Sequence, residues 1–144
     1  MTVRPAVAAD VPRIVEMGVR FVAESEYWKL GTANPDKIAV LALSLIESGG
    51  LFVAEDASGI VGMLGGCLMD HPMLDSLVAS ELAWWVEPDH RGTAGARLLS
   101  AFAAWARERG ANALHMVAPN VRVAMHYKRL GYFEMETSFM RRID

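Results

Sequence analysis

The first half of the chain alternates between helical and strand-like spacing of its apolar residues. Apolar residues recur at helical spacing over residues 8–23, and this pattern predicts an amphipathic helix. Asn34 and Pro35 form a helix-start signal. The second helix that they predict runs to about Glu47 and is closed by Gly49 and Gly50. Shorter apolar runs predict strands over residues 2–6, 51–55, 60–69 and 78–86.

The second half of the chain continues with two helices, each followed by a strand. The predicted elements are a helix over residues 95–109, a strand over 114–118, a helix over 121–130 and a final strand region over 132–141. The full order is β-α-α-β-β-β-α-β-α-β. It predicts a mixed sheet with helices packed on it, an α/β (α+β) fold, in one domain over residues 1–144.

The composition narrows the classes to which the chain can belong. Of its 144 residues, 53% are hydrophobic and 22% are charged, as in a packed globular domain. The net charge of −3 argues against nucleic-acid binding, and no apolar run is long enough for a membrane span. There is one cysteine, and no trio of side chains has metal-ligand spacing. We therefore expect a cytoplasmic protein with no membrane partner and no metal.

A loop of small residues, Arg91-Gly92-Thr93-Ala94-Gly95-Ala96, lies between a predicted strand and a predicted helix. The first N–H groups of a helix have no partner in the helix and carry partial positive charge, so they bind phosphate well when small residues let it approach. Residues 89–144 hold 9 basic and 5 acidic side chains, which suits an anion. The alternative interpretation is an ordinary strand-to-helix turn, because a glycine loop alone is a weak motif.

Two motifs around this loop resemble the GCN5-related N-acetyltransferase (GNAT) superfamily. The first is Val86-Glu87-Pro88 followed by the loop. The second is matched by Asn120, Ala124, Tyr127, Gly131 and Tyr132. The run ELAWWVEPDHRG is also similar to phage or prophage acetyltransferases. The resemblance implies a mostly antiparallel central sheet with helices on both faces, and acetyl-CoA as the cofactor.

The resemblance also assigns residues to the cofactor. It implies that the loop binds the diphosphate of acetyl-CoA, and that a backbone N–H, that of Val86, stabilises the thioester oxygen. The residues so assigned are Val86, Arg91, Gly92, Thr93, Ala94, Gly95, Ala96, Arg97 and Asn120. Ala94 departs from the family pattern, which has glycine there, and we expect it to reduce the clearance for the cofactor.

Tyr127 matches the tyrosine that protonates the leaving thiolate in this family, although a helical tyrosine also packs in a core. Glu81 is the candidate base. Strict alternation along the strand places Glu81 on one face with Ala83 and Trp85, where burial would raise its pKa. The alternatives for Glu81 are an ion pair or exposure to solvent at the end of the strand.

The acceptor pocket is assigned to two loops by analogy with the family. They contribute Tyr27, Trp28 and His71, whose alternative roles are surface exposure or packing. The expected activity moves an acetyl group to a primary amine of a small molecule or peptide. The alternative function is an inactive CoA-binding sensor of the same fold. The last strand is a candidate homodimer interface.

Overall fold

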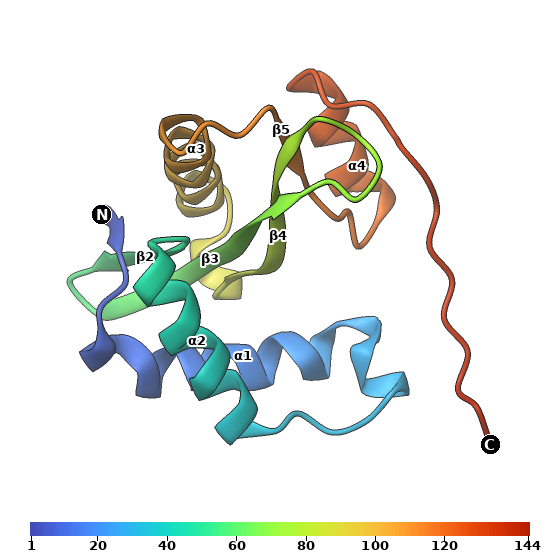
Figure 1. Ribbon diagram of the computed structural model, residues 1–144. Coiled ribbons are helices and arrows are strands. Elements are labelled where there is room, and N and C mark those ends of the chain that lie inside the picture. Colours follow the sequence, from blue (N-terminus) through green and yellow to red (C-terminus); the bar gives the residue numbers. More distant parts are fainter.

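The computed structural model describes residues 1–144 and contains one sheet of five strands in the order β1-β2-β3-β4-β5 (Figure 1). The first four strands pair antiparallel, and β5 pairs with β4 in parallel. The strands are β1 (Thr2–Pro5), β2 (Leu51–Asp56), β3 (Gly59–Asp70), β4 (Leu77–Val86) and β5 (Ala113–His115). The predicted mixed and mostly antiparallel sheet is thereby confirmed.

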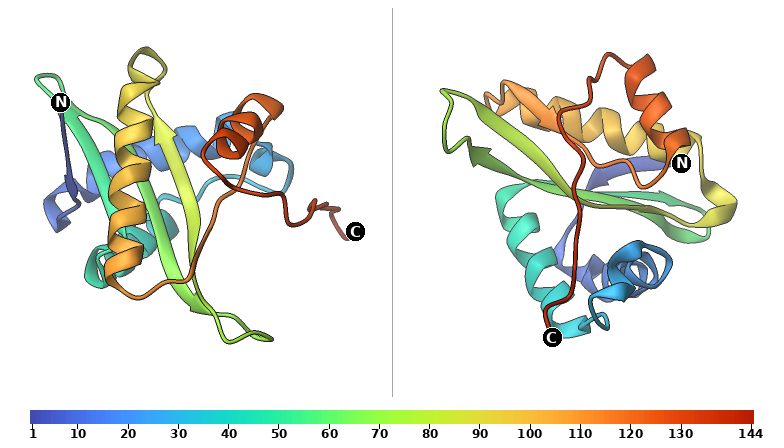
Figure 2. Two further views of the ribbon diagram at one scale, coloured as in Figure 1. Left: turned by 90° about the horizontal axis from the view of Figure 1, so that it is seen from above. Right: turned by 90° about the vertical axis from the view of Figure 1, so that its right-hand side faces the viewer.

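Helices cover both faces of this sheet, as predicted (Figure 2). The pair α1 (Val11–Glu24) and α2 (Pro35–Ser48) lies on one face, and α3 (Thr93–Glu108) and α4 (Val121–Arg129) lie on the other. Each face has its own core. Met17 and Val53 are fully buried on the side of α1, and Leu98 and Phe102 are fully buried on the side of α3. No helix is both long enough and apolar enough to span a membrane.

The capping signals in the sequence act as predicted at α2. The Asn34 side chain accepts hydrogen bonds from the N–H groups of Asp36 and Lys37 at 3.0 and 3.2 Å, and Pro35 begins the helix. Gly49 ends it with φ at 84°, in the left-handed region. Local chemistry thus decides where this helix begins and ends.

The predicted final strand over residues 132–141 is wrong. No part of this segment is in a strand, and it runs from α4 away from the sheet (Figure 1). A strand needs a neighbour that completes its hydrogen bonds. The edge of the sheet near the end of α4 is β5, which has only three residues instead of the five predicted. Hydrophobic alternation alone therefore did not produce a strand.

Candidate active site

β4 and β5 separate soon after they meet. Their pairing joins Val78–Ser80 to Ala113–His115, and residues 81–86 of β4 have no strand beside them on that side. The opposite side of β4 is paired with β3 along its whole length. One edge of β4 is therefore open over its second half, and its backbone groups can reach a bound molecule.

Val86 presents its backbone N–H to this open edge. The next residue, Glu87, donates its N–H to the Val61 carbonyl at 2.8 Å. Because hydrogen-bonded and non-hydrogen-bonded pairs alternate in antiparallel strands, the Gly62–Val86 pair turns its polar groups outward. Nε of Arg91 donates to the outward carbonyl of Val86 at 3.0 Å. The N–H of Val86 has no partner in the protein.

The first turn of α3 begins close to the end of β4. Gly92 precedes it with φ at 108°, a backbone conformation that favours glycine. The N–H groups of Thr93, Ala94 and Gly95 have no acceptor in the protein, since the first bond of the helix runs from Ala96 to Gly92. Free N–H groups at a helix start can bind an anion, so the geometry is compatible with the anion site expected from the sequence.

Ala94 does not narrow this loop as its sequence position led us to expect. Its side chain is fully buried in the α3-side core, and its φ is negative. The positive φ falls on Gly92 instead. The methyl group of Ala94 therefore points away from solvent and leaves the approach to the first turn of α3 free.

The two arginines of the loop have partners within the protein. The Arg91 guanidinium lies 5.0 Å from the centre of the Trp85 ring and 3.9 Å from a Glu24 carboxylate oxygen. Arg97 is exposed and donates to the Met1 carbonyl at 2.8 Å. Arg91 therefore fixes the path from β4 to α3, whereas Arg97 contacts the start of the chain.

Glu81 lies on the opposite face of β4 from the one that alternation predicted. Gly65 pairs with Ala83 and Gly66 pairs with Glu81, so Leu82 is the extra residue of a β-bulge. Ala83 packs in the core on the α1 side, and the charge of Glu81 acts on Tyr127 in the core on the α3 side. The expectation that Glu81 shares a face with Ala83 and Trp85 is wrong, because one inserted residue reverses the alternation.

Glu81 and Tyr127 meet at Val117. Burial raises the pKa of Glu81 from its ordinary value of 4.5 to about 7, although a hydrogen bond with the Val117 backbone acts in the opposite direction. The Tyr127 hydroxyl donates to the Val117 carbonyl at 3.2 Å. Burial, and then the negative charge of Glu81, raise the pKa of Tyr127. A carboxyl group and a phenol, each with a raised pKa, thus occupy one site beside the open edge of β4.

Two further aromatic side chains pack against Tyr127. Its ring centre lies 6.2 Å from that of Trp84 and 5.2 Å from that of Tyr132, and its residue exposure is 5%. Asn120 caps α4, since its side-chain carbonyl accepts from the Val123 N–H at 3.0 Å. The second sequence motif therefore begins α4 with Asn120 and buries Tyr127 on its inner face.

The three predicted acceptor residues do not lie together. Tyr27 and Trp28 lie in a 3₁₀ turn, Glu26–Lys29, that follows α1. His71 lies in the β3–β4 hairpin, where its Nδ1 accepts from the Met73 N–H at 3.1 Å. This hairpin is at the other end of β4 from the start of α3 (Figure 2), roughly 30 Å away at about 3.3 Å per residue of strand. The structure does not bring His71 to the open edge near Val86.

Tyr27 lines an apolar cavity of about 220 Å³ between α1, α2 and the sheet. Leu82, the bulged residue of β4, lines it as well, and twelve of its fourteen lining residues are hydrophobic. Leu82 is 41% exposed and Tyr27 is 48% exposed. Leu82 directly follows Glu81 in the chain, but the cavity that it lines is on the opposite face of the sheet from the Glu81 side chain.

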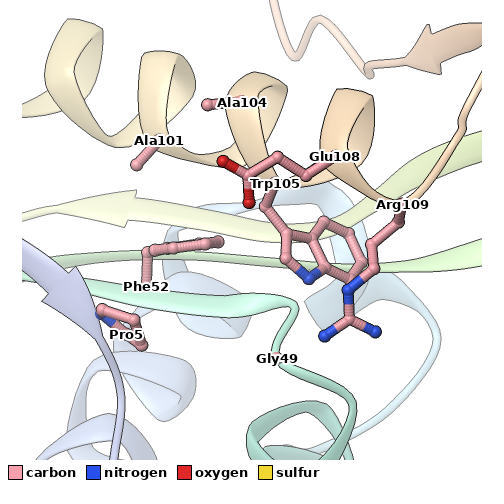
Figure 3. Close-up of a pocket in the computed structure, with 8 residues that line it drawn as sticks. All are labelled: Pro5, Gly49, Phe52, Ala101, Ala104, Trp105, Glu108 and Arg109. Atoms are coloured by element: carbon pink, nitrogen blue, oxygen red, sulfur yellow. The ribbon is translucent and has the colours of Figure 1, made fainter.

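A larger cavity of about 380 Å³ lies away from these groups, between α3 and the β1–β2 edge. Figure 3 shows Phe52 and Trp105 in its wall and Glu108 and Arg109 beside them. The indole nitrogen of Trp105 has no hydrogen-bond partner, but its atom is buried and a bound molecule does not reach it. This hollow holds none of the residues predicted from the sequence motifs.

The sequence analysis did not predict a buried ion-pair cluster at the end of β4. Glu87 has an exposure of 8% and accepts from Arg13 at 3.0 Å and from Arg20 of the same helix. Arg20 also lies over the Trp85 ring, 5.5 Å from its centre. The cluster joins α1 to the end of β4. An acidic residue directly before Pro88 in an apolar run was the available signal.

We expect Glu87→Gln to lower the free energy of unfolding by about 1–3 kcal/mol, because two charge-assisted hydrogen bonds lose their ionised acceptor. Urea unfolding followed by tryptophan fluorescence measures this. The matched control is Glu16→Gln, which removes an exposed i,i+3 partner of Arg13 at 3.1 Å and should change stability by less than about 1 kcal/mol. Equal effects of the two variants would contradict a structural role for the Glu87 cluster.

A family model described as the acetyltransferase (GNAT) family matches residues 21–132. The chain belongs to this family. The match covers most of the chain, including the start of α3, Glu81 and Tyr127. A sequence comparison with curated proteins finds no match.

Several solved structures share the fold along the whole chain. A transcriptional regulator from Bacillus halodurans C-125 is 20% identical, with a TM-score of 0.77 and 99% of both chains covered. A ribosomal-protein-alanine N-acetyltransferase from Brucella melitensis biovar Abortus 2308 is 17% identical, with a TM-score of 0.72, covering 99% of this chain and 100% of that one. A predicted acetyltransferase from Clostridium acetobutylicum, solved with acetyl-CoA, is 17% identical, with a TM-score of 0.77 and coverages of 98% and 95%.

Proposed function

We propose that this GNAT protein transfers the acetyl group of acetyl-CoA directly to a primary amine while both are bound. The observation that carries the proposal is the convergence of two kinds of group on one open strand edge. Free backbone N–H groups lie at Val86 and at the start of α3. A carboxyl group and a phenol meet at Val117 beside them. Membership of an acetyltransferase family supports the same reaction class.

The free N–H groups fit acetyl-CoA. Those of Thr93, Ala94 and Gly95 would bind its diphosphate, since a helix start favours an anion. The N–H of Val86 would donate to the thioester oxygen, where negative charge develops during attack. The thioester supplies an activated acetyl group, and the protein supplies its position and the proton transfers.

Glu81 and Tyr127 divide the proton transfers between them. The Glu81 carboxylate, with a pKa of about 7, accepts a proton from the acceptor ammonium so that the amine nitrogen can attack. As the new C–N bond forms and the C–S bond breaks, the Tyr127 hydroxyl would give its proton to the departing sulfur, and the second proton that the attacking nitrogen loses would restore the phenol. Protonated Glu81 no longer repels the phenolate, so the first transfer makes Tyr127 a stronger acid for the second.

A free-thiol assay over a panel of amines tests this function. We expect acetyl-CoA to raise the melting temperature, and thiol to be released only when an acceptor amine is added. The alternative, an inactive CoA-binding sensor, would give the thermal shift without thiol release for any amine. The buried side chain of Ala94, which leaves the approach to the first turn of α3 free, favours the active enzyme over this alternative.

The acceptor that fits best carries an apolar group. Its amine would lie near Glu81, and its apolar part would pass around the open edge of β4 into the cavity that Leu82 and Tyr27 line on the other face. We expect Leu82→Ala to raise KM about tenfold for an amine with a branched alkyl or aromatic group, and to change KM less than twofold for a polar polyamine. Steady-state kinetics with both amines measures this. An equal change for both amines would contradict the apolar subsite.

A further inference from the structure

The Trp84 side chain connects the two parts of the candidate site. Trp84 belongs to the half of β4 whose edge is open, and its ring centre lies 6.2 Å from that of Tyr127. It also packs on the first turn of α3, because a Cβ built on Gly95 would lie 3.4 Å from Cζ2 of the indole. One side chain therefore contacts both Tyr127 and the helix start that carries the free N–H groups.

The indole edge that carries the N–H group faces the start of α3. The atoms nearest to a Cβ on Gly95 are Cζ2, Cε2 and Nε1 of Trp84, at 3.4, 3.9 and 3.9 Å. These three atoms are neighbours on the N–H edge of the ring. Trp84 thus adds one side-chain donor beside the backbone donors of Thr93, Ala94 and Gly95.

The Trp84 N–H group has no acceptor in the protein, and a bound molecule can reach it. No side-chain hydrogen bond includes Trp84, although the residue is partly buried against the α3-side core. The indole nitrogens of Trp85 and Trp105 also lack partners, but those two atoms are buried, whereas Nε1 of Trp84 is not. Indole N–H groups in partly buried positions usually have a hydrogen-bond partner. A ligand can supply the missing one.

The chemistry of the indole selects which ligand this is. The N–H group donates and cannot accept, so it suits an oxygen acceptor and does not suit the ammonium group of an acceptor amine. A hydrogen bond to a charged oxygen is also stronger than one between neutral groups. The N–H edge faces Gly95, whose backbone N–H is one of the three assigned to the diphosphate of acetyl-CoA.

We propose that Trp84 binds acetyl-CoA, with its indole N–H group donating to a diphosphate oxygen at the first turn of α3. This inference rests on the proposed use of acetyl-CoA. It gives the diphosphate a side-chain donor in addition to the backbone donors of the helix start. The role requires tryptophan at position 84, because a phenylalanine ring there would keep the packing on Tyr127 and lose the donor.

The indole ¹H–¹⁵N signals of the full chain test this contact. The chain has four tryptophans, and the Trp84 signal is the one that disappears in Trp84→Phe. We expect acetyl-CoA and ADP to move the Trp84 signal and to leave the Trp105 signal in place, since ADP carries the diphosphate without the thioester arm. A Trp84 signal that neither compound moves would overturn the proposal. A shift with S-acetylpantetheine, which lacks the diphosphate, as large as that with ADP would overturn the assignment to the diphosphate.

Affinity measurements separate the donor from the packing. Trp84→Phe should weaken binding of acetyl-CoA and of ADP by the same factor, about tenfold, in isothermal titration. The matched control is Trp105→Phe, the same replacement in the same core, which should change both affinities less than about twofold. Unchanged affinity in Trp84→Phe, or equal losses in the two variants, would overturn the proposal.

Thiol release by the wild type is measured alongside these titrations. If the Trp84 signal moves and Trp84→Phe binds more weakly, the contact with the cofactor is supported even when no amine gives thiol release. If thiol release occurs and the Trp84 signal stays in place, the enzyme is supported and the Trp84 contact is wrong. Failure of this inference and failure of the proposed function are therefore separate results.

Discussion

Replacement of Tyr127 by phenylalanine should lower kcat at least about 100-fold and leave acetyl-CoA affinity within about twofold of the wild type. The phenol is 5% exposed, it meets Glu81 at Val117, and it has no hydrogen-bond partner other than the Val117 carbonyl. Its loss therefore removes a proton donor and leaves the ring packing in place. Free-thiol release measures kcat, and isothermal titration with acetyl-CoA measures binding.

Tyr132→Phe is the matched control for that experiment. Tyr132 belongs to the same aromatic cluster and also has a pKa raised by burial, but its hydroxyl has no hydrogen-bond partner in the protein. We expect its kcat to change less than about threefold. Equal activity of Tyr127→Phe and the wild type would remove Tyr127 from the reaction, and equal losses in both variants would point to packing rather than proton transfer.

Replacement of Glu81 by glutamine should lower kcat about 100-fold at pH 8 and abolish the rise of kcat/KM through pH 7. The wild-type rate should rise as pH passes the Glu81 pKa of about 7, because only the carboxylate accepts a proton. The variant keeps the shape of the side chain and loses the titration. A pH–rate profile of kcat/KM for both proteins measures this, and the same inflection in the variant would contradict Glu81 as the base.

Glu81 should also make stability depend on pH. The folded state holds the Glu81 proton more tightly than the unfolded chain, so ionisation costs stability in the folded state. The free energy of unfolding should therefore fall as pH rises from about 4.5 to about 7, by about 3 kcal/mol in total. Glu81→Gln should remove this decrease. Urea unfolding at pH 5 and pH 8 compares the two proteins independently of catalysis.

Short sequence signals predicted the ends of helices and the turns, because residues close together in the sequence determine these features. The Asn34 cap and the Gly49 ending of α2 lie where the sequence placed them. The turn from β4 to α3 could be predicted because a run of small residues at a helix start is a local signal that does not depend on the rest of the fold. The fold class followed from the order of these elements, and it is confirmed.

The predictions that failed concern features that depend on contacts between residues far apart in the sequence. The bulge at Leu82 reverses the alternation of side chains in the part of β4 that precedes it, so the Glu81 side chain lies on the same face as Tyr127. A Cβ on Gly66 would lie 2.3 Å from the Ser80 carbonyl oxygen, which shows how closely the strands approach there. The paired glycines at 65 and 66 were the signal that could have indicated an irregularity.

The last predicted strand failed for a different reason. Apolar and polar residues alternate in this segment, but a strand also needs a neighbouring strand to pair with. Residues 133–144 have no such neighbour in the protein. His71 likewise could not be placed from the sequence, because hairpin length and strand direction put it at the far end of β4.

The most direct test of the central claim is a ¹H–¹⁵N NMR titration of the full chain with acetyl-CoA. We predict the largest shifts at the backbone amides of Thr93, Ala94, Gly95 and Val86, the four N–H groups that the fold leaves free beside the open edge of β4. If acetyl-CoA binds and these four amides keep their positions in the spectrum while others move, acetyl-CoA does not bind at the start of α3 beside β4.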